Sequence, residues 1–264
     1  RSAIPQQGWQ VTQDALGSGP VVIGTGSTLT LENANTTSAT VTKDNRVSGQ
    51  GLLKIAFATN TTPRVTTLSG LSGFAGTVQV GSASASTGDK LDMAGAQAPQ
   101  ATVQIENGHT VYVGSDGASV RLSSVALSGS GNAENRGALR FAANASKLEA
   151  AVSLLSDATI ACDSATATLD GAISGTAGSG ATNVLTQGAV ASAASLTLSG
   201  VISDGSNGGR VALVQSKGKL TLATTNTYSG GTTINGGGTL QLGVNDALPV
   251  SSTLILGETN GIGN

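Results

Sequence analysis

The chain has 264 residues, of which 38 are Gly, 11% are charged and 2% are aromatic, and its formal net charge is −2. This composition excludes the Lys- and Arg-rich surface by which proteins bind nucleic acids or anionic membranes. No apolar run approaches the roughly 18 residues of a membrane-spanning helix. Because large side chains normally supply much of a thick core, the sequence favours a thin core that is repeated many times.

Short segments in which apolar residues alternate with Thr or Ser recur along the chain and end at Gly, Asn or Asp. Alternation with a period of two is typical of half-buried strands, and Gly, Asn and Asp favour tight corners. In chain order the pattern predicts strands within Val21–Leu31, Val78–Gly81, Val103–Ile105, Val111–Gly114, Val125–Gly129, Ser195–Gly200, Leu220–Leu222, Leu240–Gly243 and Leu254–Gly257.

One segment, Phe141–Ser156, has helical propensity because it is rich in Ala, Leu, Lys and Glu. It has no clear capping residue at either end, and the β-branched Ile160 and a Thr-rich stretch follow at once. We therefore favour a non-helical conformation for this segment.

The chain also repeats itself, since the motif of Leu169–Gly175 recurs 29 residues later from Leu198 onward. A supersecondary unit repeated along a chain predicts a solenoid. We therefore expect an all-β fold, a right-handed parallel β-helix (β-solenoid) over residues 1–264. At roughly 20–25 residues per coil it would have about 11–13 coils. Its ends would be open sheet edges that need a cap or a partner.

The stretch Lys219–Gly243 contains the pattern LTL, then NTYSGGTTINGG and TLQLG. It resembles the passenger-associated transport repeat, also called the autotransporter-associated β-strand repeat, of bacterial autotransporter-type passengers. The motif residues that carry the resemblance are Asn226, Tyr228, Gly230, Gly231, Thr232, Asn235, Gly237, Leu240, Leu242 and Gly243. Residues 121–264 resemble coils with such repeats, whereas residues 1–120 resemble the family only in style.

The resemblance implies a secreted or cell-surface β-solenoid that is exported across the outer membrane. An outer-membrane barrel would be a partner only if the native chain continues C-terminally. The sequence departs from the repeat at Ala223 and Thr224, where a Ser-Gly pair is more usual, and at the extra Gly of residues 236–238.

Residues that could carry chemistry are few. We expect the single His, His109, to be a solvated turn residue, and Cys162 to be a buried core residue rather than a nucleophile. Tyr228 reads as a corner residue packed over the Gly230–Gly231 bend rather than as an exposed ligand-stacking ring. Asn226 and Asn235 could form side-chain ladders with Asn residues of neighbouring coils.

Two functions are compatible with these features. We favour a non-catalytic structural or adhesive module, with no cofactor, metal or nucleic acid, that associates with itself through coil ends or sides and could bind a surface glycan or protein. The alternative is a β-helix polysaccharide lyase or glycoside hydrolase, which requires clustered carboxylates. The candidates for such clusters are Asp89 with Asp92, Asp157 with Asp163, and Asp170 with Asp204.

Overall fold

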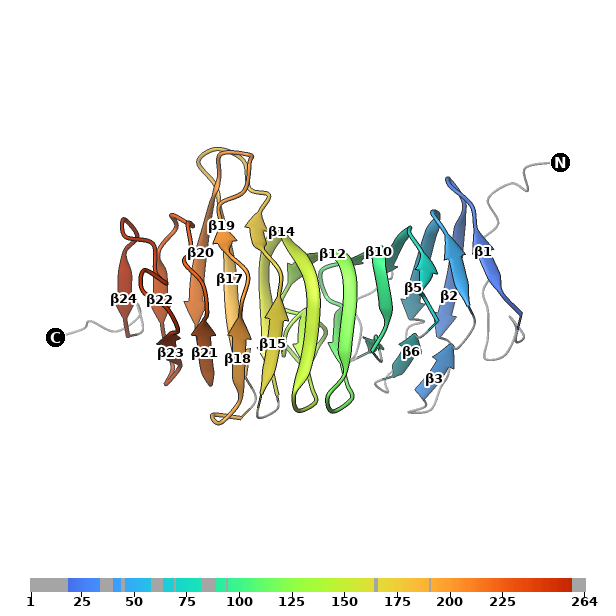
Figure 1. Cartoon of the computed structure of the whole chain (residues 1–264), viewed down its shortest axis with the longest axis horizontal. Coiled ribbons are helices and arrows are strands. Elements are labelled where there is room, and N and C mark those ends of the chain that lie inside the picture. Colours follow the sequence, from blue (N-terminus) through green and yellow to red (C-terminus); the bar gives the residue numbers. More distant parts are fainter. Residues whose placement is uncertain are drawn as a thin grey trace.

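The computed structural model describes residues 19–33, 40–43, 46–57, 64–68, 70–81, 89–93, 95–163, 166–189 and 191–257. All helices and strands assigned in these ranges are β-strands, β1 to β24. They stack side by side into a rod, with β1 at one end and β24 at the other (Figure 1). Residues 1–18 and 258–264 of the expected solenoid lie outside the described part.

The rod has three faces, and every pairing between its named strands is parallel. The first face comprises β1 (Val21–Ile23), β4 (Val47–Gly49), β7 (Gly73–Phe74), the first parts of β10 (Gln97–Ile105), β12 (Ser119–Gly129) and β14 (Ser146–Cys162), then β15 (Ala167–Asp170), β18 (Ser195–Leu198), β21 (Lys219–Leu222) and β23 (Thr239–Leu242).

The second face has β2 (Thr28–Asn33), β5 (Leu52–Phe57), β8 (Thr77–Val80), the later parts of β10, β12 and β14, then β16 (Ile173–Gly175) and β19 (Ile202–Ser203). The third has β3 (Thr40–Lys43), β6 (Val65–Leu68), β9 (Lys90–Asp92), β11 (Thr110–Val113), β13 (Leu139–Phe141), the end of β14, β17 (Thr182–Ala189), β20 (Arg210–Gln215), β22 (Thr232–Ile234) and β24 (Leu254–Leu256).

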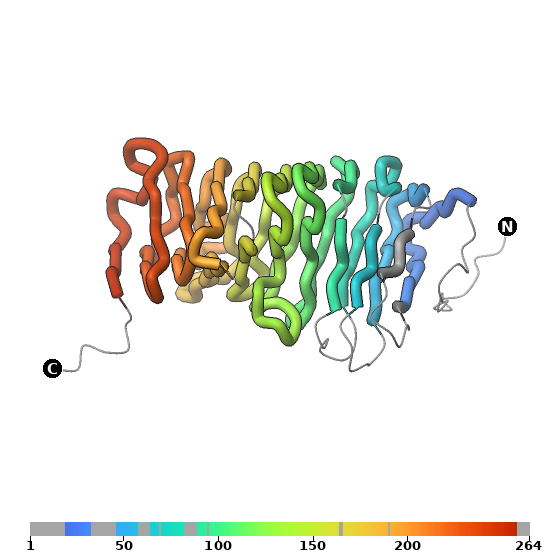
Figure 2. Tube along the Cα trace, turned by 90° about the horizontal axis from the view of Figure 1, so that it is seen from below, coloured from blue at the N-terminus to red at the C-terminus, as the bar shows by residue number. Residues whose placement is uncertain are grey.

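Inward-facing aliphatic side chains form ladders along the rod. One ladder on the second face is in continuous register and at most 1% exposed: Leu53, Val78, Val103, Val125, Val152, Ile173 and Ile202. Burying each such side chain contributes about 1.5–3 kcal/mol relative to leaving it exposed. The stacked coils therefore share a narrow core, seen along its length in Figure 2.

The predicted β-solenoid is confirmed, but the expected number of coils is wrong. The described strands make ten coils, numbered here from the N-terminal end; the first eight have a strand on each face and the last two lack the middle one. Successive coils are offset by between 20 residues, from Leu222 to Leu242, and 29 residues, from Leu169 to Leu198. Longer loops therefore reduce the number of coils below 11.

The predicted strands all form, although Val21–Leu31 is two strands, because the chain turns a corner between Ile23 and Thr28. The 29-residue repeat is confirmed as well, since Leu169 lies beside Leu198 and Ile173 beside Ile202. The segment 146–162 is the 17-residue strand β14, as the non-helical interpretation requires. Within the described residues no helix is long and apolar enough to cross a membrane.

Candidate functional site

A buried ion pair lies at the corner where the second face turns into the third. Arg64 precedes β6 and Asp89 precedes β9, so the two residues stack in coils 2 and 3. The guanidinium donates from Nη2 to Asp89 Oδ2 at 2.7 Å and from Nε to Oδ1 at 3.2 Å, and the Arg64 backbone N–H donates to Oδ1 at 2.7 Å. The two side chains are only 1% and 2% exposed, so this pair is shielded from solvent.

His109 stands at the equivalent corner of coil 4 and is 1% exposed. Its ring stacks on Phe57 with a centroid distance of 6.4 Å, and Arg64 Cζ lies 5.9 Å from the centroid of the same Phe57 ring. The prediction of a solvated turn histidine is therefore wrong. The chain immediately around His109 does form a turn, but parts of other coils cover it.

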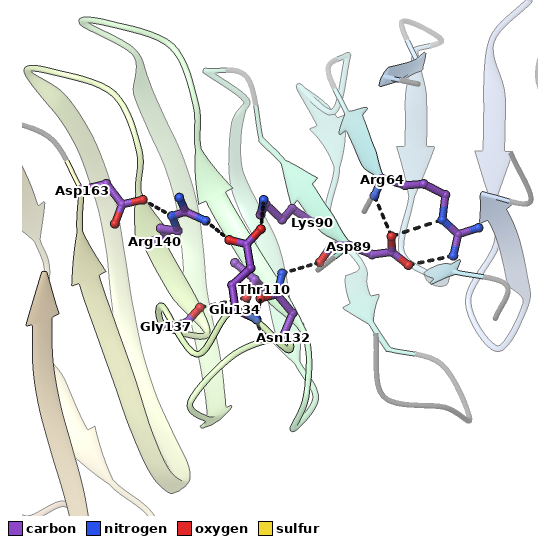
Figure 3. Close-up of polar contacts among 9 residues, drawn as sticks. All are labelled: Arg64, Asp89, Lys90, Thr110, Asn132, Glu134, Gly137, Arg140 and Asp163. Carbon is purple, nitrogen blue, oxygen red and sulfur yellow. Dashed lines mark hydrogen bonds and ion pairs between the residues drawn. The ribbon is translucent and has the colours of Figure 1, made fainter. Parts of the chain in front are cut away.

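A loop from coil 5, residues 130–137, is fixed across the short turn of coil 4. Asn132 donates from Nδ2 to the Asp89 carbonyl at 3.0 Å, and its backbone N–H donates to Thr110 Oγ1, also at 3.0 Å. The Thr110 hydroxyl in turn donates to the Gly137 carbonyl at 2.9 Å. These bonds, drawn in Figure 3, attach the loop to two other coils.

Four charges of alternating sign continue from this loop along the rod (Figure 3). Glu134 pairs with Lys90 of coil 3 at 2.6 Å and with Arg140 of β13 at 2.6 Å, and Arg140 also pairs with Asp163 of coil 6. Burial would raise the pKa of Glu134, but the hydrogen bonds and charges of Lys90 and Arg140 outweigh it and hold this pKa below its usual value. The cluster links coils 3, 5 and 6, and each of its carboxylates is engaged by a cation.

Tyr112 lies in register between Asp92 and Arg140 on the third face. Burial, reinforced by the charge of Asp92 and partly offset by that of Arg140, raises the pKa of Tyr112 to about 12. Burial also raises the pKa of Tyr228, the second of the two tyrosines in the chain.

We expect the tyrosinate absorbance of the folded protein to increase only well above pH 10. A raised folded-state pKa favours the neutral phenol, so this contribution to stability is complete below the ordinary pKa of 10.0 and is lost as the pH rises toward 12. An ultraviolet pH titration of Tyr228→Phe isolates Tyr112, with the urea-unfolded chain as the control. Titration of the folded variant near pH 10 would contradict this assignment.

A hollow of about 400 Å³ lies beside the same loop, on the outer surface of the third face. Its floor includes Thr159 and Ala161 of β14 and their register partners Thr186 and Gly188 of β17. Exposed Arg136 of the loop and exposed Lys217 after β20 lie at its two ends, and the lining is completed by Asn135, Ala189 and Ser216. We call this hollow the lateral groove.

The carboxylate pairs considered for catalysis do not assemble. Asp89 pairs with Arg64, whereas Asp92 accepts from the Gly114 backbone N–H. Asp170 ends a strand of the first face and pairs with Lys147. The described residues contain no group of three His, Cys, Asp or Glu side chains that could hold a metal ion.

The other two acidic candidates also have separate partners. Asp157 accepts from the Val184 backbone N–H, while Asp163 pairs with Arg140. Asp204 follows the second face and accepts from the backbone N–H groups of Val211 and Ser229. Burial would raise the pKa of Asp204, but these hydrogen bonds hold it below its usual value. Cys162 is completely buried, as predicted.

The C-terminal end of the rod leaves inward positions uncovered. Leu222 and Leu242 occupy one ladder, but Leu222 is 1% exposed and Leu242 is 50% exposed. Leu254 and Leu256 stack on Thr232 and Ile234 and are 46% and 72% exposed. At the other end the first coil is closed, since Ile23 and Leu31 are only 3% and 4% exposed.

Coil 9, with β21 and β22, and the following β23 coincide with a known repeat. A family model described as Passenger-associated-transport-repeat matches residues 215–242. Residues 215–242 are a passenger-associated transport repeat. Comparison with curated proteins and with solved structures finds no match.

Within the passenger-associated transport repeat, Tyr228 is completely buried, and its hydroxyl lies 2.6 Å from Thr232 Oγ1. A Cβ added at Gly230 would lie 2.5 Å from the Val211 carbonyl oxygen, and Gly231 has φ = +91°. The repeat thus needs glycine at both positions, because one has no space for a side chain and the other adopts a left-handed conformation.

The remaining motif residues of the repeat lie in its second half. Asn235 begins the turn between β22 and β23, where its carbonyl accepts from the Gly238 N–H at 2.8 Å and Gly237 has φ = +81°. Leu240 is half-buried, and the N–H of Gly243 donates to the Leu222 carbonyl. Leu240, Leu242 and Gly243 therefore belong to the last coil.

Asn226 of the repeat replaces the missing strand of the second face. Its Oδ1 accepts from the Ile202 N–H of coil 8 at 2.7 Å, and its Nδ2 donates to the Ala247 carbonyl of coil 10 at 2.7 Å and to the Thr224 carbonyl at 3.0 Å. The prediction of a ladder of Asn side chains is therefore wrong for Asn226, which binds backbone groups of neighbouring coils instead.

Proposed function

We propose that the protein is a non-catalytic structural module of an exported bacterial passenger, located outside the cell or on its surface, whose C-terminal end joins a second copy. The observation that carries this proposal is the exposure of Leu242, Leu254 and Leu256 at inward positions of the last coil. Uncovered apolar side chains beside unpaired strand edges favour the addition of further strands. The passenger-associated transport repeat supports export.

The two ends of the rod differ, and this difference favours one mode of association. The inward residues Ile23 and Leu31 of the first coil are already covered, so that end offers no matching apolar surface. Two C-terminal ends would therefore meet each other. Such a contact uses the same surface of both chains and closes at the dimer instead of growing into a filament. The sides of the rod stay accessible for adhesive contacts.

We expect light scattering during size-exclusion chromatography to give twice the chain mass of 25.7 kDa at high protein concentration. The double variant Leu242→Asp/Leu256→Asp is expected to be monomeric, because a buried unpaired carboxylate is costly. Val22→Asp is the matched control, since Val22 is 74% exposed near the other end of the rod. A monomeric wild type, or an open series of oligomers, would refute the dimer.

The non-catalytic part of the proposal has its own test. Incubation with a panel of polysaccharides, with and without Ca²⁺, is expected to give no cleavage. Reproducible cleavage that disappears in Asp170→Asn or Asp204→Asn would instead establish the lyase or hydrolase alternative.

A further inference from the structure

We propose that the lateral groove binds an extended acidic saccharide. The groove lies in coils 5 to 8 and is remote from the C-terminal end, so this inference stands apart from the proposed dimer. Its volume of about 400 Å³ falls within the range of small-ligand sites, about 300–1,000 Å³.

The charges of the groove select an anionic ligand of some length. Arg136 and Lys217 lie at its two ends, and its lining contains no Asp or Glu. Coils 5 and 8 are three rungs apart, which at about 4.8 Å per rung separates the ends by about 14 Å. A single carboxylate cannot contact both cations across this distance, so the ligand needs at least two acidic groups along its length.

The floor of the groove favours a saccharide over a peptide. The hydroxyl-bearing residues Thr159, Thr186 and Ser216 line it, together with Ala and Gly. The Ser216 hydroxyl donates to the Gln187 carbonyl at 2.8 Å, which leaves its oxygen as an acceptor for a sugar hydroxyl. The lining has no aromatic or large apolar side chain of the kind that anchors peptides.

The loop that carries Arg136 is held in place before any ligand arrives. Asn135 adopts φ = 51°, its N–H donates to the Asn132 carbonyl at 2.9 Å, and its side-chain oxygen accepts from the Ser130 hydroxyl at 3.2 Å. Glu134, the residue before it, is fixed by Lys90 and Arg140. A site that is rigid in advance loses less conformational entropy on binding.

The test compares three probes on the immobilised full chain: a galacturonate oligosaccharide, a neutral dextran oligosaccharide of the same length, and a poly-glutamate peptide. We expect binding of the galacturonate oligosaccharide alone. The double variant Arg136→Gln/Lys217→Gln should weaken this binding by about tenfold or more, because it removes both cations. Since both residues are exposed, its urea midpoint should match that of the wild type.

The matched control is Arg121→Gln/Lys219→Gln, which removes the same two residue types from the first face, where both are exposed. We expect its affinity to stay within about twofold of the wild type. The proposal is overturned if no galacturonate oligosaccharide binds, if the control weakens binding as much as the groove variant, or if poly-glutamate binds equally well. A single Arg136→Gln variant, judged by the same criteria, replaces the double variant if that one does not fold.

Discussion

Replacing Arg64 with Met is expected to lower the free energy of unfolding by about 3–5 kcal/mol, because the change leaves the buried charge of Asp89 without its guanidinium. The backbone N–H of residue 64 still donates to Asp89 Oδ1, which favours the lower part of this range. Urea unfolding followed by circular dichroism measures the effect.

A double-mutant cycle separates the pair from the two single changes. Asp89→Asn removes the charge in the other direction, and the combined Arg64→Met/Asp89→Asn variant should be less destabilised than the sum of the single variants. Arg121→Met is the control at an exposed pair, since Arg121 and Glu149 are 60% and 34% exposed and 3.6 Å apart. It should cost at most about 1 kcal/mol. Equal losses at Arg64 and Arg121 would show that burial does not decide the outcome.

Replacing Asn226 with Ala is expected to cost about 3 kcal/mol or more. The change leaves the Ile202 N–H and the Ala247 carbonyl without the side chain that bonds both, at residues that are 0% and 1% exposed. Each buried polar group that loses its partner costs about 1–3 kcal/mol. Urea unfolding again gives the change in free energy.

Asn207→Ala is the matched control for Asn226→Ala. Asn207 is exposed, and its Nδ2 makes a comparable bond to the Thr176 carbonyl at 3.0 Å. Water can replace that bond, so the expected loss is within about 0.5 kcal/mol. If both variants lose the same stability, Asn226 does not act as the link between coils 8 and 10.

The strands of this protein could be predicted from its sequence because each is a local pattern. Alternating Leu and Thr at residues 195–198 and 219–222 place one side of the chain inward, and the corners follow from Gly and Asn. The number of coils could not be predicted as well, because it depends on loop lengths between 20-residue and 29-residue offsets.

The polar cluster and the lateral groove depend on contacts between coils, which no local pattern reveals. His109 sits in a sequence typical of a turn, yet it is buried on Phe57, more than fifty positions earlier in the chain. The one available signal was the concentration of charge at Glu134, Arg136 and Arg140. Sequence reasoning passed over it, because charges in a loop are normally solvated.

The loop that connects coil 5 to coil 3 has a mechanical consequence. A solenoid pulled from its ends can peel away one coil at a time, because each coil contacts only its neighbours. Here the contacts of Glu134 with Lys90 and Arg140, and of Arg140 with Asp163, fasten coils 3 to 6 to one another. Under force, this middle block should therefore yield as one large step between smaller ones.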